Sequence, residues 1–174
     1  TTILGGRAKN KVAIAGDGQV TLGDMAIKQR AVKVREFDTD RGTVVGGFAG
    51  AAADALTLFE KFEQKLEQYN GDLKRAIVEL AKEWRTDKIL RHLEAMLVVM
   101  DKKFSFIISG DGNVIEPDGP IVSIGSGGGF AHAAASAFYE TGKYSAKQIA
   151  ERSLKIAADI CIYTNDSITV LEIK

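Results

Sequence analysis

The first residue of the sequence carries two groups that could act together in one reaction. Thr1 bears a hydroxyl, which is a potential nucleophile, and, at the start of the chain, an α-amino group. The amino group has an ordinary pKa of about 7.7–8.0, so part of it is neutral near pH 7 and can take the proton of the hydroxyl. Removal of an initiator methionine before a small residue would give the same beginning without any catalytic purpose. Thr1 is therefore a candidate nucleophile that the rest of the chain has to support.

A glycine-rich stretch, GGFAGAAAD at residues 46–54, could supply a donor to a developing negative charge. The glycines are expected to end a strand directly before a helix. A ligand can approach the backbone closely at Gly47 because no side chain stands in the way, and N–H groups at the start of a helix lack partners within it. The stretch is a candidate oxyanion hole. A tight turn relieved by glycine explains it equally well.

A second glycine-rich stretch, IGSGGGF at residues 124–130, resembles a phosphate-binding loop without meeting its pattern. Phe130 stands where the third glycine should be, and no G-K-[ST] follows. The stretch is not a G-x-S-x-G nucleophile turn around Ser126 either, since Ile124 occupies the first glycine position. We expect a strand-to-helix turn that can offer Ser126 and backbone N–H groups to a site, and no nucleotide on this chain.

Two further residues could act beside Thr1, although local patterns select neither of them. Asp17 lies in GDGQ at the end of an expected strand, beside which the N-terminal strand should pair. Lys33 lies in AVKVREF, an expected strand with Val32 and Val34 on one face and Lys33 on the other. By periodicity alone, Lys33 is one solvated strand lysine among many.

Composition excludes several classes of protein. The chain has 174 residues, which fits one domain over residues 1–174. Its 23 Lys and Arg balance its 23 Asp and Glu, so no overall field favours nucleic acid or an anionic membrane. Cys161 is the only cysteine, which excludes an internal disulfide and fits a reducing compartment. We expect no membrane span, since no apolar run approaches about 18 residues, and the pattern of a signal peptide is missing.

The order of expected elements predicts the fold class. Strands at the beginning are followed by a helix pair, further strands, a second helix pair and a closing strand within SITVLEIK at residues 167–174. Short connections, such as the turn at Lys9-Asn10-Lys11 and GDGN at residues 110–113, favour antiparallel sheets over a βαβ arrangement. Two stacked sheets with a helix layer outside each would bury every apolar face. We therefore predict an α+β fold, a four-layer αββα sandwich.

The helices are predicted from apolar residues that recur every three or four positions. The first stripe consists of Leu56, Phe59, Phe62, Leu66 and Tyr69, and the second of Leu73, Ile77, Leu80 and Trp84. Asn70-Gly71 is expected to end the first helix. The last helix should begin with a capping box, Ser145 with Gln148, and should bury one side that comprises Ile149, Ser153, Ile156 and Ile160.

Several segments, taken together and in order, carry a resemblance that runs nearly end to end. They are Thr1-Thr2-Ile3, GDGQVTLG, KVR at 33–35, GFAG at 47–50, ADALTLFEKFEQKLE, VELAKEWRTDK, LEAML, IGSGG and DICIYTN. In this order they resemble the HslV (ClpQ) family, the peptidases of the bacterial ATP-dependent HslVU protease and relatives of proteasome β-subunits. The resemblance implies the N-terminal-nucleophile hydrolase fold and a threonine-type endopeptidase.

The resemblance also assigns roles to single residues. Thr1 is implied to be the nucleophile, with its own amine as the general base. Lys33 is implied to be the cation beside Thr1 that lowers the pKa of the amine, and Asp17 to hold Lys33. Gly47 is implied to donate its N–H to the oxyanion, and Ser126 to hydrogen-bond the terminal amine.

A sodium ion is the one cofactor that the resemblance implies. Backbone carbonyls of Ala158, Cys161 and Thr164 would bind it, with Ala158 in a position where the family usually has glycine.

The implied partners are copies of the same chain, in two stacked hexameric rings, the hexameric ATPase HslU (ClpY) that feeds and activates them, and unfolded polypeptide substrates. No nucleic acid or membrane partner is expected, and the implied location is the cytoplasm or the matrix of a bacterium-derived organelle. Two alternatives stay open: a stand-alone N-terminal-nucleophile amidohydrolase that acts on a small amide, and a catalytically inactive structural ring subunit.

Overall fold

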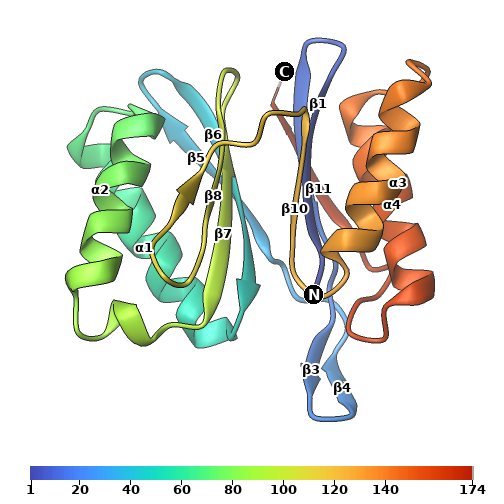
Figure 1. The fold of residues 1–174 in the computed structure, drawn as a ribbon, viewed down its shortest axis with the longest axis horizontal. Helices are drawn as coiled ribbons and strands as arrows, with labels where there is room; N and C mark the ends of the chain where they lie inside the picture. Colours follow the sequence, from blue (N-terminus) through green and yellow to red (C-terminus); the bar gives the residue numbers. More distant parts are fainter. Residues whose placement is uncertain (174) are drawn as a thin grey trace.

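Two antiparallel sheets stack face to face in the computed structural model, which describes residues 1–173, and a pair of helices covers the outer face of each sheet (Figure 1). In spatial order, the four-stranded sheet contains β10 (Ile121–Ile124), β1 (Ile3–Ala8), β2 (Lys11–Gly16) and β11 (Thr169–Ile173). The five-stranded sheet contains β5 (Val34–Thr39), β6 (Gly42–Gly50), β7 (Ala95–Met100), β8 (Ser105–Ile108) and β9 (Val114–Ile115). The helices are α1 (Ala52–Gln68), α2 (Leu73–Thr86), α3 (Gly128–Glu140) and α4 (Ala146–Ile160).

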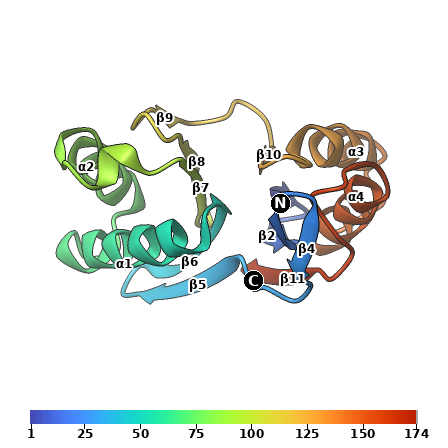
Figure 2. The same ribbon diagram turned by 90° about the horizontal axis from the view of Figure 1, so that it is seen from below.

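The predicted α+β four-layer sandwich is confirmed. Seen from below, α1 and α2 lie at one side and α3 and α4 at the other, with the two sheets between them (Figure 2). Buried apolar side chains fill each of the three spaces between layers. The sheets approach closely at Gly5, where an added Cβ would lie 2.2 Å from Met100 Sδ of the opposite sheet. Glycine at this position therefore lets the Met100 side chain pack against the β1 backbone.

The turn between β1 and β2 fixes the register that the site depends on. Lys9 and Asn10 have φ of 52° and 62°, the left-handed conformation of a two-residue hairpin turn, as the sequence predicts. Ile3 of β1 then pairs with Gly16 of β2 on one side and Ile124 of β10 on the other. The residues just before β1, just after β2 and just after β10 consequently meet at one end of the sheet.

The first helix pair confirms the predicted elements and corrects one predicted face. Phe59, Phe62 and Leu66 of α1 are buried, as the stripe predicts, but Leu56 is 65% exposed. Leu56 lies in the first turns of α1, where this face of the helix lines an open cleft described below instead of the core. Asn70 ends the helix with φ of 52°.

The second helix pair gives a similar correction. The capping box at the start of α4 is present: Ser145 accepts from the N–H of Gln148, and the Gln148 side chain accepts from the N–H of Ser145. Ile149 and Ser153 are buried, but Ile156 and Ile160 are 37% and 53% exposed. The buried side of α4 is instead completed by Ala150, Leu154 and Ala157. Alanines allow the helix to pack closely on its neighbours, which periodicity of large side chains does not reveal.

A small hairpin was not predicted. β3 (Val20–Leu22) and β4 (Met25–Lys28) pair only with each other and project from the end of the sandwich near the N-terminus (Figure 1). The segment that returns from it reaches β5 only at Val34. Val32, which was predicted to share one face of a strand with Val34, therefore lies outside the strand and is 72% exposed. A short 3₁₀ helix, Leu90–His92, was also not predicted.

At the opposite end of the sandwich, the Arg7 side chain and the connection between β9 and β10 link the two sheets. Arg7 of β1 donates to the carbonyls of Lys102 and Phe104 and to Ser105 Oγ, and so ties the four-stranded sheet to the turn before β8. The connection between β9 and β10 crosses from one sheet to the other at the same end (Figure 1). Within residues 1–173, every helix is too short or too polar to cross a bilayer.

Candidate active site

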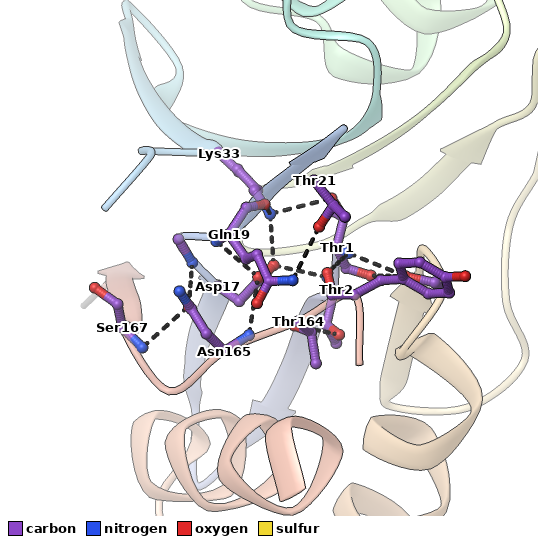
Figure 3. Close-up of polar contacts among 12 residues, drawn as sticks. Thr1, Thr2, Asp17, Gln19, Thr21, Lys33, Thr164, Asn165 and Ser167 are labelled. Atoms are coloured by element: carbon purple, nitrogen blue, oxygen red, sulfur yellow. Dashed lines mark hydrogen bonds and ion pairs between the residues drawn. The ribbon is translucent and has the colours of Figure 1, made fainter. Parts of the chain in front are cut away.

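The end of the sandwich where β1 begins brings together four of the five predicted catalytic residues. Thr1 lies just before β1, Asp17 directly follows β2, and Ser126 lies in the turn between β10 and α3. The pairing of β1 with both β2 and β10 places these three positions side by side. Lys33 comes from the other sheet, directly before β5, and its ammonium reaches Asp17 and Thr1 (Figure 3).

Lys33 and Asp17 form an ion pair beneath the Thr1 hydroxyl. Lys33 Nζ donates to Asp17 Oδ1 at 2.8 Å, to the carbonyl of Gln19 at 2.6 Å and to Thr1 Oγ1 at 3.1 Å. An ammonium has three N–H donors, so all of them are used. The side chain of Asp17 is fully buried, and that of Lys33 is 10% exposed. The pair is therefore shielded from water and presents a positive charge to the hydroxyl of Thr1.

Backbone N–H groups surround the carboxylate of Asp17. Thr2 donates to Oδ1 at 2.8 Å, Gln19 to Oδ2 at 3.0 Å and Asn165 to Oδ2 at 3.3 Å. Burial by itself would raise the pKa of Asp17, but the hydrogen bond and charge of Lys33 and the N–H groups of Thr2 and Gln19 hold that pKa below its ordinary value. Burial lowers the pKa of Lys33, and Asp17 opposes this effect.

The amine of Thr1 has two acceptors. It donates to Ser126 Oγ at 3.0 Å and to the carbonyl of Tyr163. Ser126 in turn donates its own hydroxyl proton to the carbonyl of Thr1 at 3.1 Å. Burial and, to a smaller extent, the charge of Lys33 lower the pKa of the amine, against the opposing charge of Asp17. The amine is thus biased toward its neutral, basic form.

These contacts leave the lone pair of the Thr1 amine free to accept the proton of the Thr1 hydroxyl. A neutral amine has two N–H donors, which Ser126 and Tyr163 accept, and one lone pair that stays available. The hydroxyl oxygen accepts from Lys33, so its own proton does not point at the ammonium. The arrangement can deliver the hydroxyl proton to the amine of the same residue.

The structure does not bring Gly47 to this cluster. Gly47 lies buried within β6, opposite Val34 of β5 and Val98 of β7. Since the N–H of Phe48 donates to Lys33 O toward β5, the N–H of Gly47, one residue earlier, points toward β7 and is used in the sheet. An added Cβ would lie 2.5 Å from Ile3 Cγ2, so this glycine is needed for close packing between the sheets.

Gly50, at the end of the same strand, lies where Gly47 was expected. Because N–H groups alternate in direction along a strand, the N–H of Gly50 points to the same side of β6 as the N–H of Phe48, which is the side of β5. β5 begins only at Val34, opposite Gly47, so no residue of β5 pairs with Gly50. Gly50 and Thr1 line one cleft, whereas Gly47 is not part of its lining. Its φ of 142° and the carbonyl of Glu94, 2.7 Å from an added Cβ, leave no room for a side chain.

The cleft is large and mostly apolar. It has a volume of about 1010 Å³ and passes from the β3–β4 hairpin to the beginning of α1, with Thr1 in its wall. Val20, Ala31, Ala49 and Met96 contribute apolar surface to its lining. Such a cleft can accept an extended chain with apolar side chains next to the nucleophile.

The loop that follows α4 completes the site, and no local sequence pattern indicated its contribution. Tyr163 supplies its carbonyl to the amine of Thr1, and Thr164 Oγ1 accepts from Thr2 Oγ1 at 2.9 Å. Gln19 Nε2 donates to the carbonyl of Ile162 at 2.8 Å. Only the resemblance carried by DICIYTN pointed to this loop, and backbone carbonyls such as that of Tyr163 leave no signature in residue type.

The carbonyls predicted to bind sodium lie in this loop and at the helix end before it. Ala158 belongs to the last turn of α4, and no backbone N–H within residues 1–173 donates to its carbonyl. Cys161 caps the helix, and its carbonyl accepts from Thr164 N at 3.2 Å, which leaves a second lone pair. The carbonyl end of a helix is the negative end of its dipole, so the carbonyls of Ala158 and Cys161 lie where a cation would be favoured electrostatically.

Comparison with known proteins agrees with this geometry. The chain matches the proteasome subunit family over residues 1–173. The crystal structure of eukaryotic HslV from Trypanosoma brucei is 47% identical with a TM-score of 0.92, over 99% of this chain and 98% of that one. Structures of Thiobacillus denitrificans BPH, one in complex with epoxomicin, share the fold at 19% and 18% identity, with TM-scores of 0.77 and 0.76 over 100% of this chain and 98% of theirs. Because the family match and the 47% identical relative both span the chain, this protein belongs to the proteasome subunit family as a peptidase subunit of the HslV type.

Proposed function

We propose that this chain is a threonine peptidase in which Thr1 supplies both the nucleophile and the general base. The observation that carries the proposal is the pair of contacts at Thr1: its hydroxyl accepts from Lys33, and its amine donates to Ser126 and Tyr163. The first contact stabilises a developing alkoxide, and the second leaves the amine lone pair free for the proton. This intact set also argues against an inactive structural subunit.

The reaction follows from these positions. Thr1 Oγ1 attacks the peptide carbonyl while the amine of Thr1 takes the hydroxyl proton. The resulting ammonium gives that proton to the leaving amine, and an ester between Thr1 and the acyl part of the substrate remains. A water molecule, deprotonated by the same amine, then hydrolyses the ester and restores Thr1. Lys33 stays protonated throughout, since Asp17 compensates its charge.

We assign the oxyanion donor to Gly50 in place of Gly47. The N–H of Gly50 is directed into the cleft that Thr1 lines, and it has no strand partner on that side. A tetrahedral intermediate on Thr1 needs such a donor, which typically contributes about 2.7–4 kcal/mol to catalysis.

The substrate we propose is unfolded polypeptide. The cleft runs from the β3–β4 hairpin to the beginning of α1 and is mostly apolar in its walls, so an extended chain fits it better than a folded surface does. As in HslV proteins, copies of this chain would form two stacked hexameric rings that enclose the sites, and the hexameric ATPase HslU would deliver unfolded chains and activate the peptidase allosterically. This activity belongs in the cytoplasm or in the matrix of a bacterium-derived organelle.

A sodium ion fits beside this machinery. The carbonyls of Ala158, Cys161 and Thr164 would hold it, and its charge would stabilise the loop whose Tyr163 carbonyl receives the amine of Thr1.

The proposal is tested by comparing wild type with Thr1→Ala and Thr1→Ser on an unfolded protein substrate, with and without the ATPase and ATP. We expect no turnover with alanine, residual turnover with serine, and strong stimulation by the ATPase. Equal activity in wild type and Thr1→Ala would overturn the nucleophile. Cleavage of small amides that the ATPase does not stimulate would favour the stand-alone amidohydrolase. An extra residue before Thr1 should abolish turnover without unfolding the protein.

A further inference from the structure

One polar side chain near the site uses its whole amide group to hold other segments together. Asn165 Oδ1 accepts from the N–H of Gly18 at 3.0 Å and from that of Ser167 at 3.2 Å. Asn165 Nδ2 donates to the carbonyl of Gln29 at 3.0 Å and to Gln29 Oε1 at 2.9 Å. Asn165 therefore hydrogen-bonds to both arms of the β3–β4 hairpin at its base, to Gly18 before β3 and to Gln29 after β4. Figure 3 shows Asn165 beside Asp17.

The backbone at Gly18, to which Asn165 binds, lies between the two residues that accept hydrogen bonds from Lys33. Gly18 stands between Asp17 and Gln19, whose carboxylate and carbonyl accept two of the three N–H donors of Lys33. The backbone N–H of Asn165 also donates to Asp17 Oδ2 at 3.3 Å. A shift at Gly18 would therefore move both acceptors of the ammonium that contacts the Thr1 hydroxyl.

The hairpin has few other attachments. Its two strands pair only with each other, and a two-stranded hairpin alone has little stability in water. β4 is exposed along its whole length. At the base, Ala31 N donates to the carbonyl of Gly18 at 2.8 Å, and Gln19 Nε2 donates to Ile162 O. Among residues 1–173, Asn165 is the one residue whose side chain hydrogen-bonds to the backbone of both arms.

We propose that Asn165 is a positioning residue for the reaction, which acts through the hairpin base to keep the acceptors of Lys33 in place beneath Thr1. The inference rests on the function proposed above. Asn165 itself touches neither the nucleophile nor the substrate, so its contribution is to geometry and to the exclusion of water from the Lys33–Asp17 pair.

The expected effect has a direction in pH. Burial is the main cause that lowers the pKa of the Thr1 amine. When the hairpin base loosens, water reaches the ion pair and the amine, and the pKa of the amine rises toward 8.0. The acid limb of the activity profile, which reports loss of the neutral amine, then moves to higher pH.

Three variants test this inference on the full chain with a fluorogenic peptide. Asn165→Ser keeps an oxygen that can accept from the N–H of Ser167 but cannot reach Gly18 or Gln29. Asn165→Ala loses all these bonds. We expect both variants to lower kcat by about 10- to 100-fold and to shift the acid limb upward. The matched control is Asn113→Ala in the exposed turn between β8 and β9, which should leave kcat and the pH profile unchanged.

The outcomes separate cleanly. A purely local structural role predicts that Asn165→Ser behaves like wild type, and that result in kcat and in the pH profile would overturn the inference even if Asn165→Ala fails to fold. Thr1→Ala is assayed in parallel. Full activity in Thr1→Ala would overturn the proposed function together with this inference, whereas an inactive Thr1→Ala beside a wild-type Asn165→Ser would overturn the inference alone.

Discussion

At the scale of single residues, the environment of the Thr1 amine makes the enzyme's pH dependence predictable. The amine must be neutral to act as a base, and burial and Lys33 lower its pKa below 8.0. We therefore expect kcat/KM to rise with pH and to reach half of its plateau below pH 8.0. The measurement is peptide hydrolysis between about pH 5 and 9, a range that brackets the ordinary amine pKa, with circular dichroism to verify folding. A midpoint at or above 8.0 would contradict this environment.

The buried ion pair gives a second prediction at this scale. Asp17→Asn leaves the ammonium of Lys33 in a buried place without its counter-charge, and such a loss typically costs about 3–5 kcal/mol of unfolding free energy. The double variant Asp17→Asn with Lys33→Met removes both charges and should recover most of that stability while it remains inactive. Urea unfolding and peptidase assays check the two properties separately. A double variant as unstable as the single one would show that packing, not charge, accounts for the loss.

At the scale of secondary-structure elements, α4 contains a replaceable polar group. Ser153 Oγ on α4 is buried, and within residues 1–173 it has no hydrogen-bond partner. Ser153→Ala removes this unsatisfied group and adds a better helix former, so it should stabilise the protein by about 1–2 kcal/mol. Thermal unfolding measures the effect, with Ser136→Ala on the partly buried side of α3 as the control, since the Ser136 hydroxyl has a partner in the carbonyl of His132. A lower Tm in Ser153→Ala would indicate that the hydroxyl has a partner after all.

Sequence alone predicts most elements here, because their signals are local. The turn at Lys9-Asn10 and the capping box at Ser145 depend on neighbours in the chain, and the structure confirms both. The oxyanion donor was assigned to Gly47, whereas the structure places Gly50 in the cleft. Which glycine N–H is free depends on where β5 begins to pair with β6, and that register is a property of two strands.

The elements that sequence missed are held by distant contacts. The β3–β4 hairpin has short strands and exposed apolar residues, and its base is fixed by Asn165, far away in the chain. Leu56 and Ile160 were missed for a different reason: their periodic positions predict burial, but no other element within residues 1–173 covers them in the fold. Periodicity identifies a helix but does not identify what packs against it.

At the scale of the whole molecule, the two sheets are joined differently at their two ends. The active-site end is bridged by Lys33 and Asp17, and the far end by Arg7. Arg7→Met should lower the unfolding free energy by about 1–3 kcal/mol, because the carbonyls of Lys102 and Phe104 lose their donors. The kcat of the folded fraction should stay unchanged, since Arg7 lies away from the cleft. Calorimetry and peptidase assays check this, and a fall in kcat without a loss of stability would contradict it.

The crossing between β9 and β10 has a practical consequence for anyone who wishes to attach a fluorophore or an affinity handle. The amine of Thr1 is engaged in the site, so an addition in front of Thr1 would disturb the site. An added Cβ at Gly119, in the crossing, meets nothing within 4 Å. A cysteine introduced there would accept a maleimide dye at the end of the molecule opposite the nucleophile, so the label would leave Thr1 and the cleft unaltered.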